Sequence, residues 1–156
     1  MTQIAPVFRK FVPQLLHIVV LPVFFFTFML LLRPEGVVNM LGKEWFGVHL
    51  TIMSCIILVS EILIRMLYYF LPLRINYSIY TLWCFGEIIF MSFFTALYLW
   101  LVLGKTMLYF EFVTASFRYL FLSLIFAYAI LALAMRIYDY RHKEDATDSN
   151  PAQRMR

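Results

Sequence analysis

Charged residues are scarce in this sequence: lysine, arginine, aspartate and glutamate together make up 14% of its 156 residues, whereas hydrophobic residues make up 63%. So few charges cannot cover the surface of a water-soluble domain of this length. A mean hydropathy of +0.83 points the same way. The composition therefore excludes a soluble globular protein and predicts an integral membrane protein.

Cysteine, histidine and glycine are also too sparse to build a recognisable catalytic or metal site. The two cysteines, Cys55 and Cys84, lie inside apolar stretches without disulfide or zinc spacing. His17 and His49 fall near opposite membrane faces and His142 lies in the tail, so no two could bind one haem, and each is expected to be solvated. Phosphate-binding glycine loops and nucleophile elbows are missing as well. The sequence thus indicates neither an enzyme nor a bound cofactor or metal.

What the chain does contain is a set of apolar stretches, each near the roughly 20 residues that a helix needs to cross a bilayer. We expect transmembrane helices at about residues 11–32, 48–71, 79–103 and 113–137. Arg33 and Pro34, rather than a small-residue cleavage site, follow the first stretch, so it is interpreted as a helix and not as a signal peptide. The predicted fold is an all-α, four-helix membrane bundle in residues 1–143, followed by a polar linker or disordered tail in residues 144–156.

The distribution of basic residues predicts how these helices cross the membrane. With four spans both termini share one side, and that side carries eight basic residues: Arg9, Lys10, Arg74, Arg136, Arg141, Lys143, Arg154 and Arg156. The opposite side carries four: Arg33, Lys43, Lys105 and Arg118. Because cytoplasmic segments are enriched in lysine and arginine, both termini are predicted to be cytoplasmic.

Charged residues also occur inside the predicted spans, where they are costly and need partners. Glu61 and Arg65 are four residues apart in the second span, and Glu87 lies in the third. If residues 72–78 form the turn between the two spans, Arg65 and Glu87 lie at matching depths, each roughly 15 to 18 Å along its helix from mid-turn. We therefore expect Arg65 to contact Glu61, Glu87 or both. With both carboxylates ionised the cluster carries a net charge of minus one, so it is either a structural latch or a site for a proton, an ion or a ligand.

Small residues recur at helical spacing in the fourth predicted span: Ser116, Ser123, Ala127 and Ala134. Small side chains allow helices to approach closely, which is the main attraction between helices in lipid. This packing seam is expected to lie either inside the bundle or at the interface of a homodimer.

Two segments of the sequence resemble the membrane domain of LytTR-type transcriptional regulators of Bacteroidetes. The first span and its ending resemble that family's first helix through Pro22-Val23-Phe24-Phe25-Phe26 and Leu32-Arg33-Pro34-Glu35-Gly36. The third span resembles the family's tryptophan-glycine-glutamate pattern through Leu82-Trp83-Cys84-Phe85-Gly86-Glu87-Ile88, with Ala96-Leu97-Tyr98 further on. Glu35 departs from the pattern, because the family often has phenylalanine there.

The resemblance implies a sensor and anchor module in the bacterial inner membrane, crossing the bilayer several times. Relatives of this kind continue after the fourth helix into a cytoplasmic LytTR DNA-binding domain, often act as dimers, and bind DNA only through that domain. The implied partners are thus the lipid bilayer, a C-terminal LytTR domain that would follow this chain in a longer parent protein, and a second copy. The alternative hypothesis is a small transporter or channel subunit that uses Glu61, Arg65 and Glu87 as part of an ion path.

Overall fold

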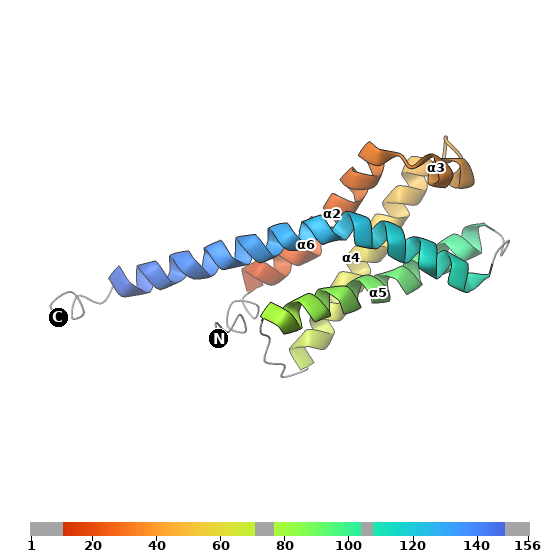
Figure 1. Cartoon of the computed structure of the whole chain (residues 1–156). Coiled ribbons are helices and arrows are strands. Elements are labelled where there is room, and N and C mark those ends of the chain that lie inside the picture. Colours follow the sequence, from red (N-terminus) through yellow and green to blue (C-terminus); the bar gives the residue numbers. More distant parts are fainter. Residues whose placement is uncertain (1–10, 71–76, 104–107, 149–156) are drawn as a thin grey trace.

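The computed structural model describes residues 11–70, 77–103 and 108–148. Within these ranges the chain is helical and contains no strand (Figure 1). The elements are α2 (Phe11–Leu32), α3 (Glu35–Leu41), α4 (Phe46–Phe70), α5 (Tyr77–Val102) and α6 (Tyr109–Asp148). The predicted all-α fold class is confirmed for this part of the chain.

Four of these helices are long and apolar enough to cross a membrane. The candidate spans are Pro13–Leu32, Phe46–Leu67, Ile79–Val102 and Tyr109–Tyr138. They begin and end within a few residues of the stretches expected from the sequence. Length and composition therefore support a membrane protein that crosses the bilayer several times.

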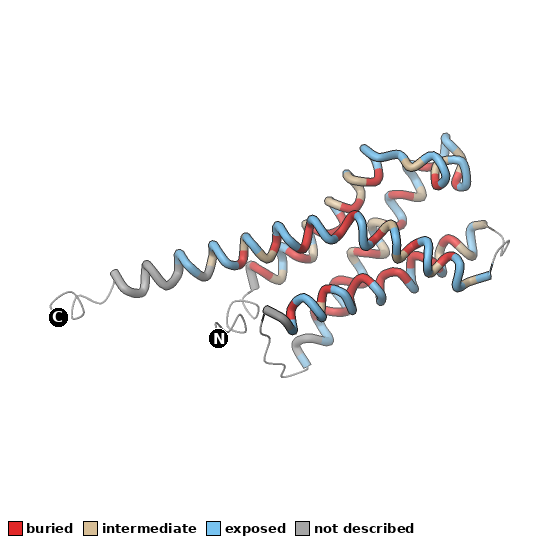
Figure 2. The backbone as a smooth tube through the Cα atoms, viewed as in Figure 1, coloured by how far each residue is buried: buried red, intermediate tan, exposed pale blue. Residues whose placement is uncertain are grey.

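The four long helices, called the bundle below, pack against one another along their inner sides. α5 lies along α6, α2 packs on α4 and α6, and α4 packs on α5. Figure 2 shows buried residues facing the neighbouring helices and exposed residues facing outward. The most completely buried apolar side chains are Leu21, Phe25, Leu50, Ile57, Met91, Leu120, Leu124 and Leu131.

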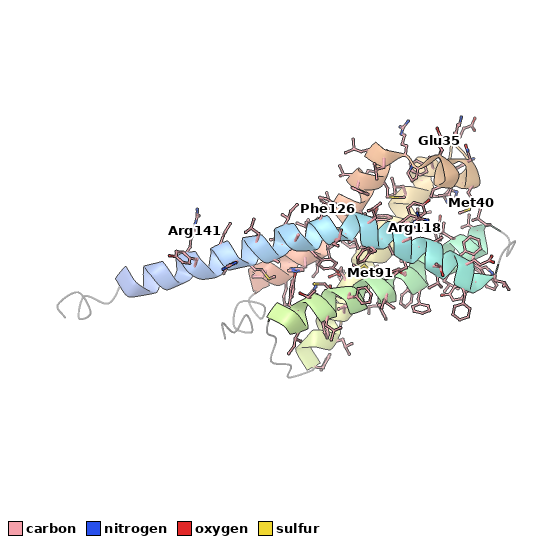
Figure 3. The ribbon with its side chains drawn as sticks, in the orientation of Figure 1. Glu35, Met40, Met91, Arg118, Phe126 and Arg141 are labelled. Atoms are coloured by element: carbon pink, nitrogen blue, oxygen red, sulfur yellow. The ribbon has the colours of Figure 1, made fainter. Side chains whose placement is uncertain are left out.

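The outward faces of the bundle are apolar as well. Phe70, Leu82 and Phe126 expose more than half of their surface, and Figure 3 shows Phe126 pointing outward while Met91 lies between the helices. In water such surfaces would drive aggregation, whereas in a bilayer they contact acyl chains. The exposed apolar side chains therefore fit a lipid environment.

The connection between the first two spans contains a short helix that was not predicted. Pro34 and Gly36 indicated a loop, but Pro34 stands directly before the first residue of α3, where its missing N–H costs little. Val37 and Leu41 bury their side chains and hold this short helix against the bundle. Gly42 ends it with a φ of 81°, a left-handed conformation that glycine adopts readily.

The last helix is much longer than predicted. The sequence indicated an end near Ile137 and a linker from Glu144, yet α6 continues without interruption to Asp148. No glycine or proline occurs between Lys105 and Asn150, so no residue in this stretch breaks the helix. Figure 1 shows this end of α6 projecting beyond the other helices, at the same end of the bundle as the start of α2. Residues 149–156 of the predicted tail lie outside the described residues.

Candidate functional site

The charged residues of the second and third spans form one buried cluster. Arg65 Nη2 donates to Glu87 Oε1 at 2.8 Å and to Glu61 Oε2 at 3.2 Å, and Arg65 Nε also donates to Glu61 Oε2 at 3.3 Å. Glu61, Arg65 and Glu87 are 0%, 4% and 3% exposed. The expected contacts of Arg65 with both carboxylates are therefore present in the structure.

Glu87 is the centre of this cluster because it accepts hydrogen bonds from three helices. Besides Arg65 of α4, the indole Nε1 of Trp83 donates to Oε1 at 2.6 Å from the preceding turn of α5. The hydroxyl of Tyr128, on α6, donates to Oε2 at 2.7 Å. Tyr128 is itself buried, so the bond is shielded from solvent. Both oxygens of Glu87 are thus satisfied, and one carboxylate links α4, α5 and α6.

Glu61 is less completely satisfied. Its Oε2 accepts from Arg65, whereas its Oε1 is buried and has no hydrogen-bond partner. Two carboxylates face one guanidinium, which leaves the cluster with an excess negative charge when both are ionised. Buried charge of this kind is unfavourable unless it is compensated. Glu61 is therefore the residue at which a proton or cation would reduce the electrostatic cost.

A second buried pair brings α2 into the polar interior. His17 Nε2 lies 2.8 Å from the hydroxyl of Tyr80 on α5, and His17 Nδ1 lies 2.7 Å from the carbonyl oxygen of Pro13. His17 is 0% exposed, so the expectation that it is solvated was wrong. Its position along α2 was predictable, but the rotation of the helix that turns it towards Tyr80 of α5 was not. His49 is partly buried and lies 2.7 Å, through Nδ1, from the hydroxyl of Tyr98.

The small residues of the fourth span lie on the inner side of α6. Ser116, Ser123 and Ala127 are buried, and Ala134 is half-buried. This side of α6 faces its neighbours in the same chain, α5 and α2. The packing seam is therefore used inside the bundle, one of the two arrangements expected from the sequence.

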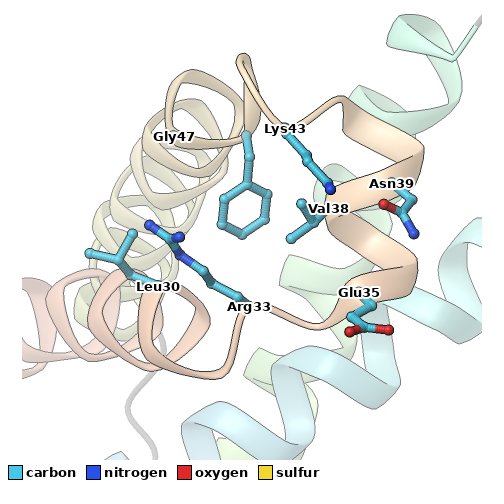
Figure 4. Close-up of a pocket in the computed structure, with 8 residues that line it drawn as sticks. Leu30, Arg33, Glu35, Val38, Asn39, Lys43 and Gly47 are labelled. Carbon is cyan, nitrogen blue, oxygen red and sulfur yellow. The ribbon is translucent and has the colours of Figure 1, made fainter.

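Two cavities open near the ends and sides of the bundle. A lateral groove of about 620 Å³ between α4 and α5 is lined by apolar residues and reaches Trp83 and Glu87. A second cavity of about 650 Å³ lies at the end of the bundle where α2, α3 and α4 meet (Figure 4). Its lining includes Arg33, Glu35 and Lys43, so the two cavities differ sharply in polarity.

Within the described residues, no three histidine, cysteine, aspartate or glutamate side chains are arranged to hold a metal ion. No protein-family model, curated protein or solved structure matches this chain. The buried cluster, the two cavities and the long helix α6 are the structural features that bear on function.

Proposed function

We propose that this chain is the membrane-embedded sensor and anchor of a LytTR-type transcriptional regulator in the bacterial inner membrane. In this proposal both termini face the cytoplasm, and α6 passes a change in helix packing to a DNA-binding domain that follows it in the parent protein. The motifs around Pro22 and around Trp83 support the family, and the excess of basic residues on the side of the termini supports the orientation.

The observation that carries the proposal is the hydrogen bond from Tyr128 to Glu87. It connects α6 to the charged cluster, so a disturbance of the cluster changes the contacts of α6 directly. Because the bond is buried, its loss would strand a carboxylate oxygen in an apolar interior, which favours a discrete rearrangement over a gradual one. A cluster that joins three helices in this way suits a two-state element.

The continuous helix beyond the span supplies the output. α6 runs from Tyr109 to Asp148, whereas its candidate span ends at Tyr138. A helix without a break transmits rotation or translation along its axis better than a flexible linker does. Arg141 lies on this projecting part (Figure 3). A movement at Tyr128 would therefore be carried out of the membrane.

The input of the proposed sensor is the lateral groove between α4 and α5. Its apolar lining suits an acyl chain or another apolar molecule from the bilayer, and Glu87 and Trp83 lie where such a molecule would meet the cluster. A molecule that displaces the indole of Trp83 would remove one of the hydrogen bonds to Glu87. The groove thus gives the membrane access to the element that holds α6.

Spin labels on the two ends of the coupled helices test this proposal. Cysteines introduced at Leu15 and Tyr140, both exposed, report the distance between α2 and the projecting part of α6 in a background with Cys55 and Cys84 replaced by alanine. Tyr128→Phe should shift or broaden this distance distribution in lipid nanodiscs. Tyr119→Phe is the matched control on the same helix, because the Tyr119 hydroxyl makes no hydrogen bond to the described residues.

An unchanged distribution in Tyr128→Phe would show that α6 does not respond to the cluster, and the sensor mechanism would be lost. The family assignment has its own test in the gene of the parent protein. A LytTR domain encoded downstream of Arg156 would support it, and a stop codon directly after Arg156 would remove it.

Transport is a second candidate function, favoured by polar atoms without partners at two depths of the bundle. Besides Glu61 Oε1, the hydroxyls of Thr95 and Ser116 are buried without hydrogen-bond partners among the described residues. Both line an internal space of about 40 Å³, large enough for a water molecule. Proteoliposomes that enclose a pH-sensitive dye distinguish the two functions by measuring proton flux. A flux that Glu61→Gln abolishes supports transport, whereas vesicles that show no proton flux with the wild-type protein support the sensor.

A further inference from the structure

The polar cavity at the end of the bundle contains two basic side chains without acidic partners. Arg33 lines it from the turn between α2 and α3, and Lys43 lines it from the loop between α3 and α4, with their charged ends pointing apart (Figure 4). The ion pairs among the described residues are those of Arg65 with Glu61 and Glu87. Neither Arg33 nor Lys43 is therefore paired with a carboxylate in this part of the chain. Glu35 lines the same cavity, but its carboxylate points away from Lys43. The cavity therefore holds two cations and one carboxylate, a net positive charge.

The backbone that presents Arg33 is unusual. Arg33 has a φ of 37° and is the only residue other than glycine with a positive φ in the described part of the chain. Its N–H bonds to the carbonyl oxygen of Met29 at 3.0 Å, so it closes the end of α2 in a position that glycine usually occupies. A side chain in this conformation is strained, and such strain is concentrated at ligand sites. The guanidinium of Arg33 is therefore presented to the cavity by a strained backbone position.

The rest of the lining suits an amphiphilic molecule. Leu30, Val38 and Phe46 supply apolar walls, and the side-chain amide of Asn39 adds a neutral hydrogen-bond donor. The cavity lies between the end of the first candidate span at Leu32 and the start of the second at Phe46, which is the level of lipid headgroups. Trp45, which precedes the lining residue Phe46 in the chain, is 62% exposed, and tryptophan is enriched at that level.

We infer that this cavity binds the phosphate group of an amphiphile. The exposed side chains of Arg33 and Lys43 turn in from opposite sides to contact the phosphate oxygens, and the apolar walls contact the adjoining part of the molecule. Arginine matches phosphate geometry through paired N–H donors, and lysine adds a second point charge. The volume of about 650 Å³ accommodates a whole headgroup rather than an isolated ion. The source is either a phospholipid of the bilayer or a soluble phosphate ester. This site does not depend on the sensor proposal, because it makes no use of the Glu87 cluster.

The test uses the purified full chain and two probes. Phosphatidylglycerol is titrated and its retention is measured by native mass spectrometry, while glycerol 3-phosphate is tested by thermal shift. The variant R33Q/K43Q should bind the effective probe roughly thirtyfold more weakly, the loss expected for two basic contacts at a membrane surface. The matched control R136Q/R141Q removes the same charge from exposed positions on α6, at the other end of the bundle, and should bind almost as wild type does.

The pattern across the two probes identifies the source of the phosphate. Sensitivity of lipid retention to R33Q/K43Q supports a phospholipid, and sensitivity of the glycerol 3-phosphate response alone supports a soluble ester. Equal binding of both probes by wild type and R33Q/K43Q, or an equal loss in R136Q/R141Q, would overturn the site. Glu35→Gln gives an independent check, because it removes the carboxylate of the cavity and leaves both cations. It should bind the probe more tightly, and unchanged or weaker binding would count against the inference.

Discussion

Arg65 Nη2 lies 2.8 Å from Glu87 Oε1, and this ion pair joins α4 to α5 inside the apolar bundle. In such a setting the pair itself adds little net stability, because both charges lose their hydration. Breaking it by removing one partner is much more costly, since the other charge is left behind. The pair therefore contributes more to selecting this arrangement of α4 and α5 than to the net stability of the fold.

A double-mutant cycle tests this coupling. Arg65→Leu should cost about 3–5 kcal/mol, because it leaves Glu61 and Glu87 buried without their cation. Arg65→Leu combined with Glu87→Leu should lose less than the sum of the two single changes, since one stranded carboxylate is removed. Thermal unfolding in detergent gives the comparison. Strictly additive losses would mean that the two residues do not interact.

The two glutamates should respond differently to the same substitution. Glu87 accepts hydrogen bonds from Arg65, Trp83 and Tyr128, so Glu87→Gln should cost about 1.5–3 kcal/mol through a lost charge-assisted bond. Glu61→Gln keeps an oxygen that can accept from Arg65 and removes the excess negative charge. Its amide nitrogen would replace Oε1, which accepts no hydrogen bond, so no existing bond is lost. Its unfolding temperature should equal or exceed that of wild type. Equal destabilisation by both variants would contradict this asymmetry.

Overpacking of the small-residue seam offers a third test. Ala127 is 0% exposed, so Ala127→Leu should force the inner side of α6 away from its neighbours and cost about 1–3 kcal/mol. Ala129, two positions along the same helix, is exposed, and Ala129→Leu should be neutral. Thermal unfolding in detergent measures both. A seam that tolerates leucine at 127 would not be close-packed inside the bundle.

The orientation of the chain is accessible to cysteine labelling in intact cells. In a background without Cys55 and Cys84, a cysteine at Asn39 should react with an impermeant maleimide, because the connection of residues 33–47 is predicted to face the periplasm. A cysteine at Tyr140 should react only after the membrane is broken. The reversed pattern would invert the assignment and place the projecting end of α6 outside the cytoplasm.

Positions along single helices were predictable from the sequence. Apolar length located the spans, and equal distances from the intervening turn placed Arg65 and Glu87 at one depth. The Trp83 bond to Glu87 could also have been found, because the residues are four apart and share a helical face. These features depend only on the regular geometry of a helix and on the cost of charge in lipid.

Contacts that depend on how the helices are rotated could not be predicted. Tyr128 of α6 reaches Glu87 of the neighbouring helix α5, and His17 of α2 reaches Tyr80 of α5, but spacing along one helix does not indicate which residue of another helix it meets. The short helix α3 was missed because Pro34 and Gly36 suit a loop as well as a helix start. The extension of α6 was missed because a polar segment without apolar periodicity resembles a linker, although nothing in it breaks a helix.

The uninterrupted helix past Tyr138 also has an electrostatic consequence for anything attached to it. Residues 139–148 of α6 extend about 15 Å at the rise of an α-helix, which is nearly two Debye lengths at physiological salt, about 8 Å each. The cytoplasmic leaflet carries a negative surface potential that decays over the same length. In the proposed cytoplasmic orientation, a nucleic acid held beyond this helix would thus lie largely outside the repulsive field of the anionic membrane, whereas one held directly at Tyr138 would not.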